Sequence, residues 1–353
     1  VCLFGEHSDW AGGYRRQDPG LEPGSTLIAG TDQGIRAEVE RHDGALVLTT
    51  VVPEGRGAPR VIPLDAGALR AEAEGGGFWS YVAGTAAELL CRHRIGGLRL
   101  ENRRMDLPVR KGLFSSAAAC VLTARAFNRL YDLDLSVRDE MELAYQGELR
   151  TGSRCGRMDQ GCAFGGRPVR MEFDGDRVEV EEIPPGRDLH LLVVDLRARK
   201  DTKRILSRLN AAYPAAPGEV ARGVRELLGP VNRRLVGEAV DALRAGDAER
   251  LGRLMVEAQE RFDRLAMPAC PEELTAPILH RVLAHDGLRP HVWGGKGVGS
   301  QGDGSAQFVA RSPKDREAAV RVVERELGMT ALRVTLRAGA GAETEAGAGA
   351  AAS

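Results

Sequence analysis

The sequence predicts a mixed protein of α and β elements, of the α/β (α+β) class, in two parts. Short apolar runs between Gly, Asp and Pro clusters predict several strands in the first half of the chain. After Leu196 the pattern changes to long stretches with helical periodicity. The boundary between the patterns falls near Pro184–Asp188, and 353 residues are enough for two packed domains.

The elements are expected in the following order. In the first half, strands are expected at Val1–Phe4, Thr26–Ala29, Ile35–Val39, Leu46–Val52, Leu98–Leu100, Val169–Phe173 and Val178–Ile183, and helices at Ala66–Glu74, Phe78–His93, Ser116–Tyr131 and Val137–Thr151. In the second half, strands are expected at Leu189–Leu196, Gln307–Ala310 and Ala331–Leu336, and helices at Asp201–Ala212, Val220–Leu228, Val231–Ala245, Ala248–Leu265, Glu272–His285 and Lys314–Leu327. Gly229-Pro230 should break the second of these helices from the third. Since Ser116–Tyr131 carries charge only at Arg125 and Arg129, we expect that helix to be buried.

The composition argues against several classes of function. With 49 basic and 50 acidic residues the formal net charge is -1, which gives no field for gathering nucleic acid. The 6 cysteines form no CxxC pair and no zinc-ligand spacing, so reduced thiols in a cytoplasmic protein are expected. No apolar run approaches the 18 or so residues that span a bilayer, and we expect no membrane partner.

The two ends of the chain look different from the rest. Val1–Phe4 has the pattern of a strand already in progress, so we expect the true N-terminus to lie upstream. Residues 338–353 are almost all Ala, Gly and Glu, and such a composition predicts a disordered tail.

One segment has the pattern of a phosphate-binding loop. Pro108-Val-Arg-Lys-Gly-Leu-Phe-Ser-Ser-Ala runs directly into the buried helix. Glycine and small hydroxyl residues at a helix start leave backbone N–H groups free, and these donors suit a phosphate. The structural alternative is an ordinary Ser N-cap before a core helix.

Two further segments carry polar or glycine-rich patterns. Glu6, His7 and Asp9 follow a strand directly and suit the binding of several hydroxyl groups. A polar turn without a binding role would have the same sequence pattern. Gly294-Gly-Lys-Gly-Val-Gly-Ser-Gln-Gly contains glycines dense enough for close backbone approach to a ligand. A flexible loop between strands is the alternative for this segment.

These segments together resemble the GHMP kinases, most closely the galactokinase-like sugar kinases. The family motif GEHTDY-x-GG reads here Gly5-Glu-His-Ser-Asp-Trp-Ala-Gly-Gly, and P-x-x-x-GLSSSA reads as the segment that begins at Pro108. Cys155-Gly-Arg-Met-Asp-Gln is similar to the CG-x-MDQ segment, and Trp79-Ser-Tyr-Val-Ala-Gly to W-x-x-Y-V-x-G with one residue fewer. The glycine segment at 294–302 stands where the third family motif is expected.

The resemblance implies an ATP- and Mg²⁺-dependent kinase that phosphorylates a hydroxyl of a small sugar-like substrate. It implies a ribosomal S5 domain 2-like domain over residues 1–187 and a ferredoxin-like domain over residues 188–337. Carried over by position, the ATP-binding residues are Lys111, Gly112, Leu113, Ser115, Ser116, Ala117, Gly297 and Gly299. Ser116 and Glu148 would contact the metal, Asp159 would be catalytic, and Glu6, His7 and Asp9 would hold the substrate. A solvated helix carboxylate is the alternative for Glu148, and a helix-capping carboxylate for Asp159.

The sequence departs from the family pattern at several positions. The family places an arginine immediately before the position of Val1, where this chain begins. Phe114 replaces a small residue of the phosphate loop, Trp10-Ala replaces Tyr-Asn, and the glycine segment differs from the usual TGAG type. A mevalonate-type acceptor and a regulator that binds sugar and nucleotide without turnover therefore stay open as alternatives. The sequence leaves the oligomeric state open.

Overall fold

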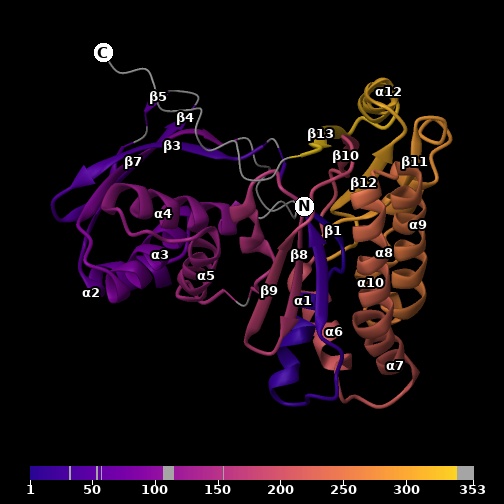
Figure 1. The fold of residues 1–353 in the computed structure, drawn as a ribbon, viewed down its shortest axis with the longest axis horizontal. Helices are drawn as coiled ribbons and strands as arrows, with labels where there is room; N and C mark the ends of the chain where they lie inside the picture. Colours follow the sequence, from indigo (N-terminus) through magenta and orange to yellow (C-terminus); the bar gives the residue numbers. More distant parts are fainter. Residues whose placement is uncertain (32, 53–54, 57, 106–114, 154, 340–353) are drawn as a thin grey trace. The chain divides into compact units, whose positions relative to one another are not determined.

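The chain divides into two compact units in the computed structural model, which describes residues 1–31, 33–52, 55–56, 58–105, 115–153 and 155–339 (Figure 1). Unit 1 comprises Val1–Asp32 and Gly166–Ser353, and unit 2 comprises Gln33–Gly165. Unit 2 is therefore inserted, in chain order, between two segments of unit 1. The domains expected at 1–187 and 188–337 divide the chain at a different place and stay a prediction.

Unit 2 is a sheet with helices on one face. The strands run in the order β3-β7-β4-β5, with β6 beside β4; β4 and β7 are parallel and the other pairs antiparallel. Their bounds are β3 Ile35–His42, β4 Ala45–Val52, β5 Gly55–Arg56, β6 Arg60–Pro63 and β7 Gly97–Met105. The helical elements are α2 Ala66–Glu74, α3 Phe78–Arg92, α4 Ser115–Tyr131, α5 Val137–Leu149 and the 3₁₀ turn η2 Asp159–Phe164.

The core of unit 2 follows from side-chain alternation on the strands. Leu46, Leu48, Leu98 and Leu100 point to one face and pack with Phe127 of α4, where the helices cover the sheet (Figure 1). The opposite face is polar and carries cross-strand ion pairs, such as Arg103 with Glu38.

Unit 1 contains two antiparallel sheets. The first has the order β1-β2-β8-β9, with bounds β1 Cys2–Phe4, β2 Gly24–Ile28, β8 Val169–Asp174 and β9 Arg177–Glu182. The second has the order β11-β12-β10-β13, with bounds β10 Leu189–Asp195, β11 Val292–Gly297, β12 Ser305–Ala310 and β13 Thr330–Leu336. The pairing of β2 with β8 joins the chain segments that flank unit 2.

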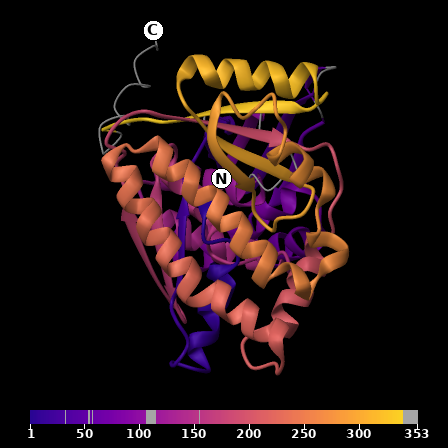
Figure 2. The same ribbon diagram turned by 90° about the vertical axis from the view of Figure 1, so that its right-hand side faces the viewer.

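Helices complete unit 1. Their bounds are α1 Ser8–Gly13, α6 Thr202–Ala212, α7 Glu219–Glu226, α8 Asn232–Ala245, α9 Ala248–Leu265, α10 Pro271–Leu274, α11 Pro277–Leu283 and α12 Pro313–Arg325, with short helical turns η1 Tyr14–Arg16, η3 Leu227–Val231 and η4 Met267–Ala269. Figure 2 shows α12 lying over the second sheet, and Ala319, Val320 and Val323 of this helix are buried there with Leu192 and Val194 of β10.

Most of the predicted elements are confirmed. The helices at Ala66–Glu74 and Ala248–Leu265 have the predicted bounds, and other predicted elements differ by a few residues at their ends. The predicted break at Gly229-Pro230 is also confirmed, since Gly229 has non-helical dihedral angles.

Several expectations were wrong. Glu272–His285 is not one helix but α10 and α11, separated where Ala276 adopts a left-handed backbone conformation before Pro277. Half of the expected glycine loop, Gly294–Gly297, lies in β11. The helix α1, which follows soon after β1, and the strand β6 were not expected at all.

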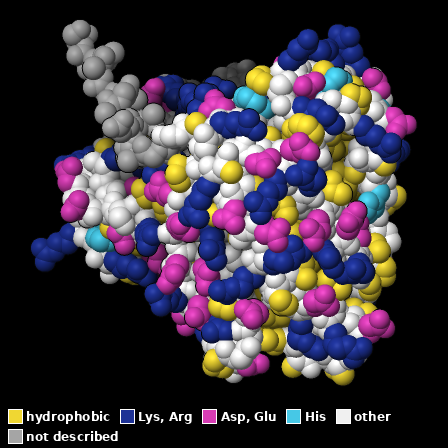
Figure 3. Space-filling view, turned by 45° about the vertical axis from the view of Figure 1, so that its right-hand side comes forward, with side chains coloured by type: hydrophobic (Ala, Val, Ile, Leu, Met, Phe, Trp, Pro, Cys, Tyr) yellow, Lys and Arg dark blue, Asp and Glu magenta, His cyan; other side chains and the backbone are white. Residues whose placement is uncertain are grey.

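The surface mixes charges of both signs. Figure 3 shows Lys and Arg side chains interspersed with Asp and Glu, and many of these groups form ion pairs, such as Arg234 with Glu238 and Glu257. In the part of the chain that the structure describes, none of the helices combines the length and apolar character needed to cross a membrane.

Candidate functional site

In unit 2, three side chains from separate elements meet at the start of α4. The Ser116 hydroxyl lies beside the carboxylate of Glu148 on α5 and favours its charged form. Gln160 of η2 donates from Nε2 to Glu148 Oε2 at 2.6 Å. Glu148 is only 3% exposed, and this burial raises the pKa of its carboxyl, while Ser116 and Gln160 act in the opposite direction.

Close helix packing places Glu148 at this point. A Cβ on Gly147 would lie 2.5 Å from the Thr85 Oγ1, so glycine lets α5 approach α3 closely. Arg125 of α4 then joins the neighbouring elements, since its Nε donates to Glu140 Oε2 of α5 at 2.9 Å and its guanidinium to the Ala163 carbonyl of η2 at 2.8 Å. Helix α4, which the sequence predicted to be buried, thus binds η2 through Arg125, one of its two charged residues.

The arrangement fits a hard cation. Gln160 is fully buried, and its Oε1 has no hydrogen-bond partner among the described residues. An unsatisfied acceptor beside a carboxylate and a hydroxyl suits Mg²⁺, which prefers oxygen ligands and keeps several waters. The described residues contain no group of three or more His, Cys, Asp or Glu side chains that could hold a metal. Any magnesium here would therefore rely on Ser116, Glu148 and bound substrate.

The other predicted residues of unit 2 lie around the same helix start. Asp159 is half-buried and begins η2, the turn that also carries Gln160. Helix α4 begins at Ser115, and Ala117 is fully buried, so that Ala117 could reach a ligand only through its backbone. Lys111, Gly112 and Leu113 lie outside the described residues.

In unit 1, a tight turn between β1 and α1 presents the predicted acceptor-binding residues. Gly5 has φ +85°, and a Cβ there would lie 2.1 Å from the Ser25 carbonyl oxygen, so only glycine fits. His7 also adopts a left-handed conformation, with φ 69°. Glu6 and His7 are buried, whereas Asp9 in the first turn of α1 is half-buried.

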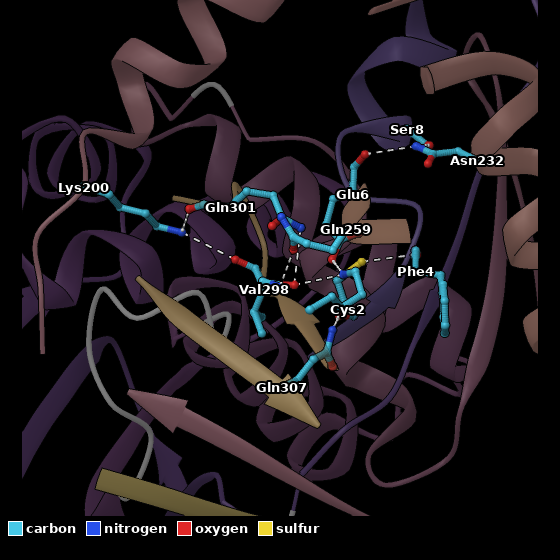
Figure 4. A network of polar contacts seen from close by, with 12 residues as sticks. Cys2, Phe4, Glu6, Ser8, Lys200, Asn232, Gln259, Val298, Gln301 and Gln307 are labelled. Atoms are coloured by element: carbon cyan, nitrogen blue, oxygen red, sulfur yellow. Dashed lines mark hydrogen bonds and ion pairs between the residues drawn. The ribbon is translucent and has the colours of Figure 1, made fainter. Parts of the chain in front are cut away.

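Glu6, which Figure 4 labels, forms a buried ion pair with Lys296 of β11. Lys296 is 1% exposed and Glu6 7% exposed, and Lys296 Nζ also donates to the Gly297 carbonyl at 2.9 Å. Burial raises the pKa of Glu6, while Lys296 lowers it, so the ammonium counteracts the cost of burying the carboxylate. Glu6 therefore has one strong partner within the protein itself.

Neighbouring amides fix both ends of this ion pair. Asn232 of α8 donates to Ser8 Oγ at 3.0 Å, and Gln307 of β12 donates to the Cys2 carbonyl at 2.8 Å (Figure 4). Gln259 of α9 accepts from the Gly297 backbone N–H at 2.7 Å. Side chains from three further elements thus bind the segments that carry Glu6 and Lys296.

His7 is neutral, and only one of its two ring nitrogens has a hydrogen-bond partner among the described residues. Its Nδ1 accepts from Trp10 Nε1 at 3.2 Å, and its ring stacks on Phe262 with centroids 6.1 Å apart. Burial, with the positive charges of Lys200 and Lys296, lowers the pKa of His7 to about 4. Because indole nitrogen only donates, the single proton of the neutral ring lies on Nε2.

The glycine segment has a packing reason as well as a possible binding role. A Cβ on Gly294 would lie 2.2 Å from the Gly252 carbonyl oxygen of α9, and one on Gly295 would lie 2.4 Å from the Phe308 ring. These glycines are therefore required by the contact of β11 with α9 and β12. Gly297 ends β11, and Gly299 lies in the following turn with φ 64°.

The structure brings the predicted residues together in two sets, one in each unit. Ser116 and Glu148 touch each other in unit 2, and Asp159 follows in η2. In unit 1, His7 lies within electrostatic reach of the lysines. Sequence reasoning missed the following residues of these sets: Gln160, Lys200, Gln259 and Lys296. Lys296 could have been noticed as a lone charge inside a glycine run, whereas Gln259 gave no signal among the polar residues of an amphipathic helix.

Comparisons with known proteins identify similar sequences and folds. The sequence profile of the GHMP kinases N terminal domain matches residues 80–166. The galactokinase of Thermococcus kodakarensis is 29% identical over 201 residues, which is 51% of this chain and 55% of that protein. The chain thus matches about half of the length of this curated relative.

Two solved structures share the fold. Lactococcus lactis galactokinase complexed with galactose superimposes with a TM-score of 0.71 and 19% identity, over 97% of this chain and 92% of that chain. L. major mevalonate kinase in complex with R-mevalonate superimposes with a TM-score of 0.67 and 20% identity, over 97% of this chain and 94% of that chain. At such identities these likenesses establish the fold alone.

Proposed function

We propose, on the premise that this chain belongs to the GHMP kinase superfamily and is galactokinase-like, that it transfers the γ-phosphate of ATP to a hydroxyl of a sugar or sugar-like acceptor. The observation that carries the proposal is the contact of Ser116, Glu148 and Gln160 at the start of a helix that follows a phosphate-loop motif. Phosphoryl transfer depends mainly on positioning and charge neutralisation, and these groups suit that task.

Each residue set has a separate role in this proposal. Backbone N–H groups of the segment from Lys111 to Ala117 would bind the nucleotide phosphates, together with the turn that carries Gly297 and Gly299. Asp159 would orient the acceptor hydroxyl and accept its proton. Glu6, His7 and Asp9 would bind other hydroxyls of the acceptor, and polar groups of this kind reject analogues that lack a hydroxyl.

The metal would be Mg²⁺, held by Ser116 and Glu148. When bound, it would neutralise charge on the phosphate oxygens. The orphaned Gln160 Oε1 beside Glu148 supports this assignment. The family domains, ribosomal S5 domain 2-like and ferredoxin-like, belong to the same proposal, and the expected cytoplasmic location stays a prediction.

The test is ATP turnover with a panel of acceptors. Purified protein would be assayed with free sugars, their acid derivatives and R-mevalonate. We expect turnover with one acceptor, and a loss of at least a hundredfold in the Asp159→Asn and Glu148→Gln variants. Glu142→Gln is the matched control, because Glu142 lies on the same helix and binds Arg157 and Gln146.

The outcomes separate the candidate functions. Turnover with R-mevalonate alone would replace the sugar by the mevalonate-type acceptor, for which the shared fold with a mevalonate kinase is the supporting observation. Tight binding of ATP and an acceptor without turnover would indicate a regulator. Equal turnover by the Asp159→Asn variant would contradict the proposed catalytic role.

A further inference from the structure

Lys200 places an ammonium group beside the predicted acceptor-binding turn of unit 1. It precedes Asp201, the N-cap of α6, and its Nζ donates to the Gln301 carbonyl at 2.8 Å and to the Val298 carbonyl at 3.5 Å (Figure 4). A Cβ on Gly304 would lie 2.9 Å from this Nζ, so the glycine leaves the space that the ammonium occupies. The turn at 298–304 therefore fixes the position of the charge.

The charge of Lys200 has no direct counterion. Among the described residues, no carboxylate lies within ion-pair distance of Lys200, and Glu6, its electrostatic neighbour, is paired with Lys296. Burial lowers the pKa of Lys200 to about 8, and Glu6 offsets only part of this effect. Backbone carbonyls take two of the three N–H donors. The third donor and the uncompensated charge suit an anionic partner.

His7 Nε2 is a second donor without an acceptor, and it lies within electrostatic reach of the Lys200 ammonium. The proton of neutral His7 is on Nε2, as the Trp10 contact requires, and this atom is buried without a hydrogen-bond partner in the described part of the chain. The Ser300 backbone comes near His7 without forming a hydrogen bond of normal geometry. One turn joins the two groups, since Lys200 Nζ binds the Val298 and Gln301 carbonyls on either side of Ser300, the residue whose backbone lies beside His7.

We propose that the acceptor carries an anionic group, a carboxylate or a phosphate, which binds between His7 Nε2 and Lys200 Nζ. The inference rests on the proposed function, since it names the class of acceptor for that site. One anionic group supplies two oxygen atoms and can satisfy both donors, whereas a hydroxyl would satisfy one donor and leave the ammonium charge unopposed. The hydroxyls of Thr202 and Ser300, 3.2 Å apart, offer further donors beside it.

The test compares acidic and neutral acceptors that are otherwise alike. Calorimetric titrations at pH 7 without nucleotide would pair galactose with galacturonic acid and glucose with glucuronic acid, and would include R-mevalonate and inorganic phosphate. We expect at least one acid to bind about tenfold or more tightly than its neutral counterpart, with a preference that weakens as salt is added. Equal affinity of acid and neutral members in every pair, with no binding of R-mevalonate or phosphate, would overturn the proposal.

Variants identify the group responsible. Lys200→Met should abolish the preference and Lys200→Arg should retain part of it, since arginine keeps the charge. Lys203→Met is the matched control, because Lys203 is exposed on α6 and should leave the preference unchanged. If Lys200→Met fails to fold, the wild-type pairs still decide the question.

Two further outcomes have distinct meanings. Weaker binding of Mg-ATP by Lys200→Met, with the acid preference intact, would assign Lys200 to a nucleotide phosphate and overturn the proposal. Binding of an acid without any turnover would support the anion site while the proposed kinase function fails. Turnover with neutral sugars alone would support the kinase function and overturn the anion site.

Discussion

At the scale of single residues, the ion pair of Glu6 and Lys296 is the main electrostatic feature of unit 1. Both side chains are buried, and 290 residues separate them in the chain. Removal of one partner from a buried ion pair leaves an uncompensated charge, while removal of both charges costs much less. The ion pair therefore affects stability chiefly through the uncompensated charge that stays buried when one member is removed.

This asymmetry gives a prediction for Lys296→Met. We expect the free energy of unfolding to fall by about 3–5 kcal/mol, because Glu6 would stay buried without its partner. The double variant Glu6→Gln with Lys296→Met should recover part of this loss. Urea unfolding of both single variants and the double variant would measure the coupling, and values that simply add would contradict it.

His7 gives a prediction about pH. Its folded-state pKa of about 4 lies below the ordinary value of 6.5, so the unfolded chain takes up the proton first as the pH falls. Stability from His7 is thus fully present above pH 6.5 and is lost as the pH falls toward 4, by up to about 3 kcal/mol.

The measurement compares the wild type with His7→Gln in urea at pH 7 and pH 4.5. The wild type should lose about 2–3 kcal/mol more than the variant between these pH values. The charged groups that act on the pKa of His7 are Lys200 and Lys296, and both are present in the wild type and in the variant. An identical pH dependence would show that His7 is not held neutral.

At this scale the sequence identified candidates but not their partners. Glu6, His7 and Asp159 were recognised because short motifs contain them. Lys296 and Gln160 also stand inside the quoted segments, but no role was assigned to them, because their importance arises from contacts and the sequence carries no information on which polar groups meet in the folded chain.

At the scale of elements, the contact of α9 with β11 depends on the absence of side chains. A Cβ on Gly252 would lie 2.5 Å from the Trp293 Cβ, so Gly252→Ala should lower the free energy of unfolding by about 1–3 kcal/mol. Gly237→Ala in α8 is the matched control, since nothing lies within 4 Å of a Cβ there. The control should stabilise the protein by about 0.5–1 kcal/mol, because alanine favours a helix interior. Thermal unfolding would show opposite shifts, and equal shifts would contradict the argument.

Arg125 gives a second prediction at this scale. Arg125→Gln removes the pair with Glu140 and the bond to Ala163, so η2 should lose its link to α4. We expect faster hydrogen exchange at 159–164 and a lower kcat with little change in KM for ATP. Arg150→Gln is the control, because the side-chain partners of Arg150, Glu88 and Cys91, belong to α3 and not to η2. Unchanged exchange in η2 would show that Arg125 does not position it.

The sequence predicted most helices because long amphipathic patterns and caps are local. It missed β11 because glycine has a low strand propensity, and only the packing against α9 explains the glycines of that strand. It missed α1 because a helix of six residues with two glycines has almost no local signal. The long predicted helix at Glu272–His285 was wrong because the break before Pro277 was overlooked.

At the scale of the whole molecule, unit 2 interrupts unit 1 in the chain. Strand β2 pairs with β8 across the entire inserted unit. The sequence predicted the domain boundary at a change of pattern near Pro184–Asp188. Such a change cannot reveal that an early strand pairs with a much later one.

The insertion allows a test that treats each unit by itself. Predicted nucleotide-binding residues occur in unit 2 at Ser115–Ala117 and in unit 1 at Gly297 and Gly299. Hydrogen exchange with and without saturating Mg-ATP should show protection at both places. Protection in unit 2 alone would remove the two glycines from the proposed nucleotide site, and Mg-AMP serves as a control that lacks the transferable phosphate.

The first strand also has a consequence for how the protein is made. Gln307 binds the Cys2 carbonyl across 305 residues, whereas β2, the sheet neighbour of β1, begins already at Gly24. At bacterial or eukaryotic elongation rates, synthesis of the residues between Cys2 and Gln307 takes roughly 15–60 s. During that time β1 has β2 to pair with, but the Cys2 carbonyl has to wait for its side-chain partner on β12.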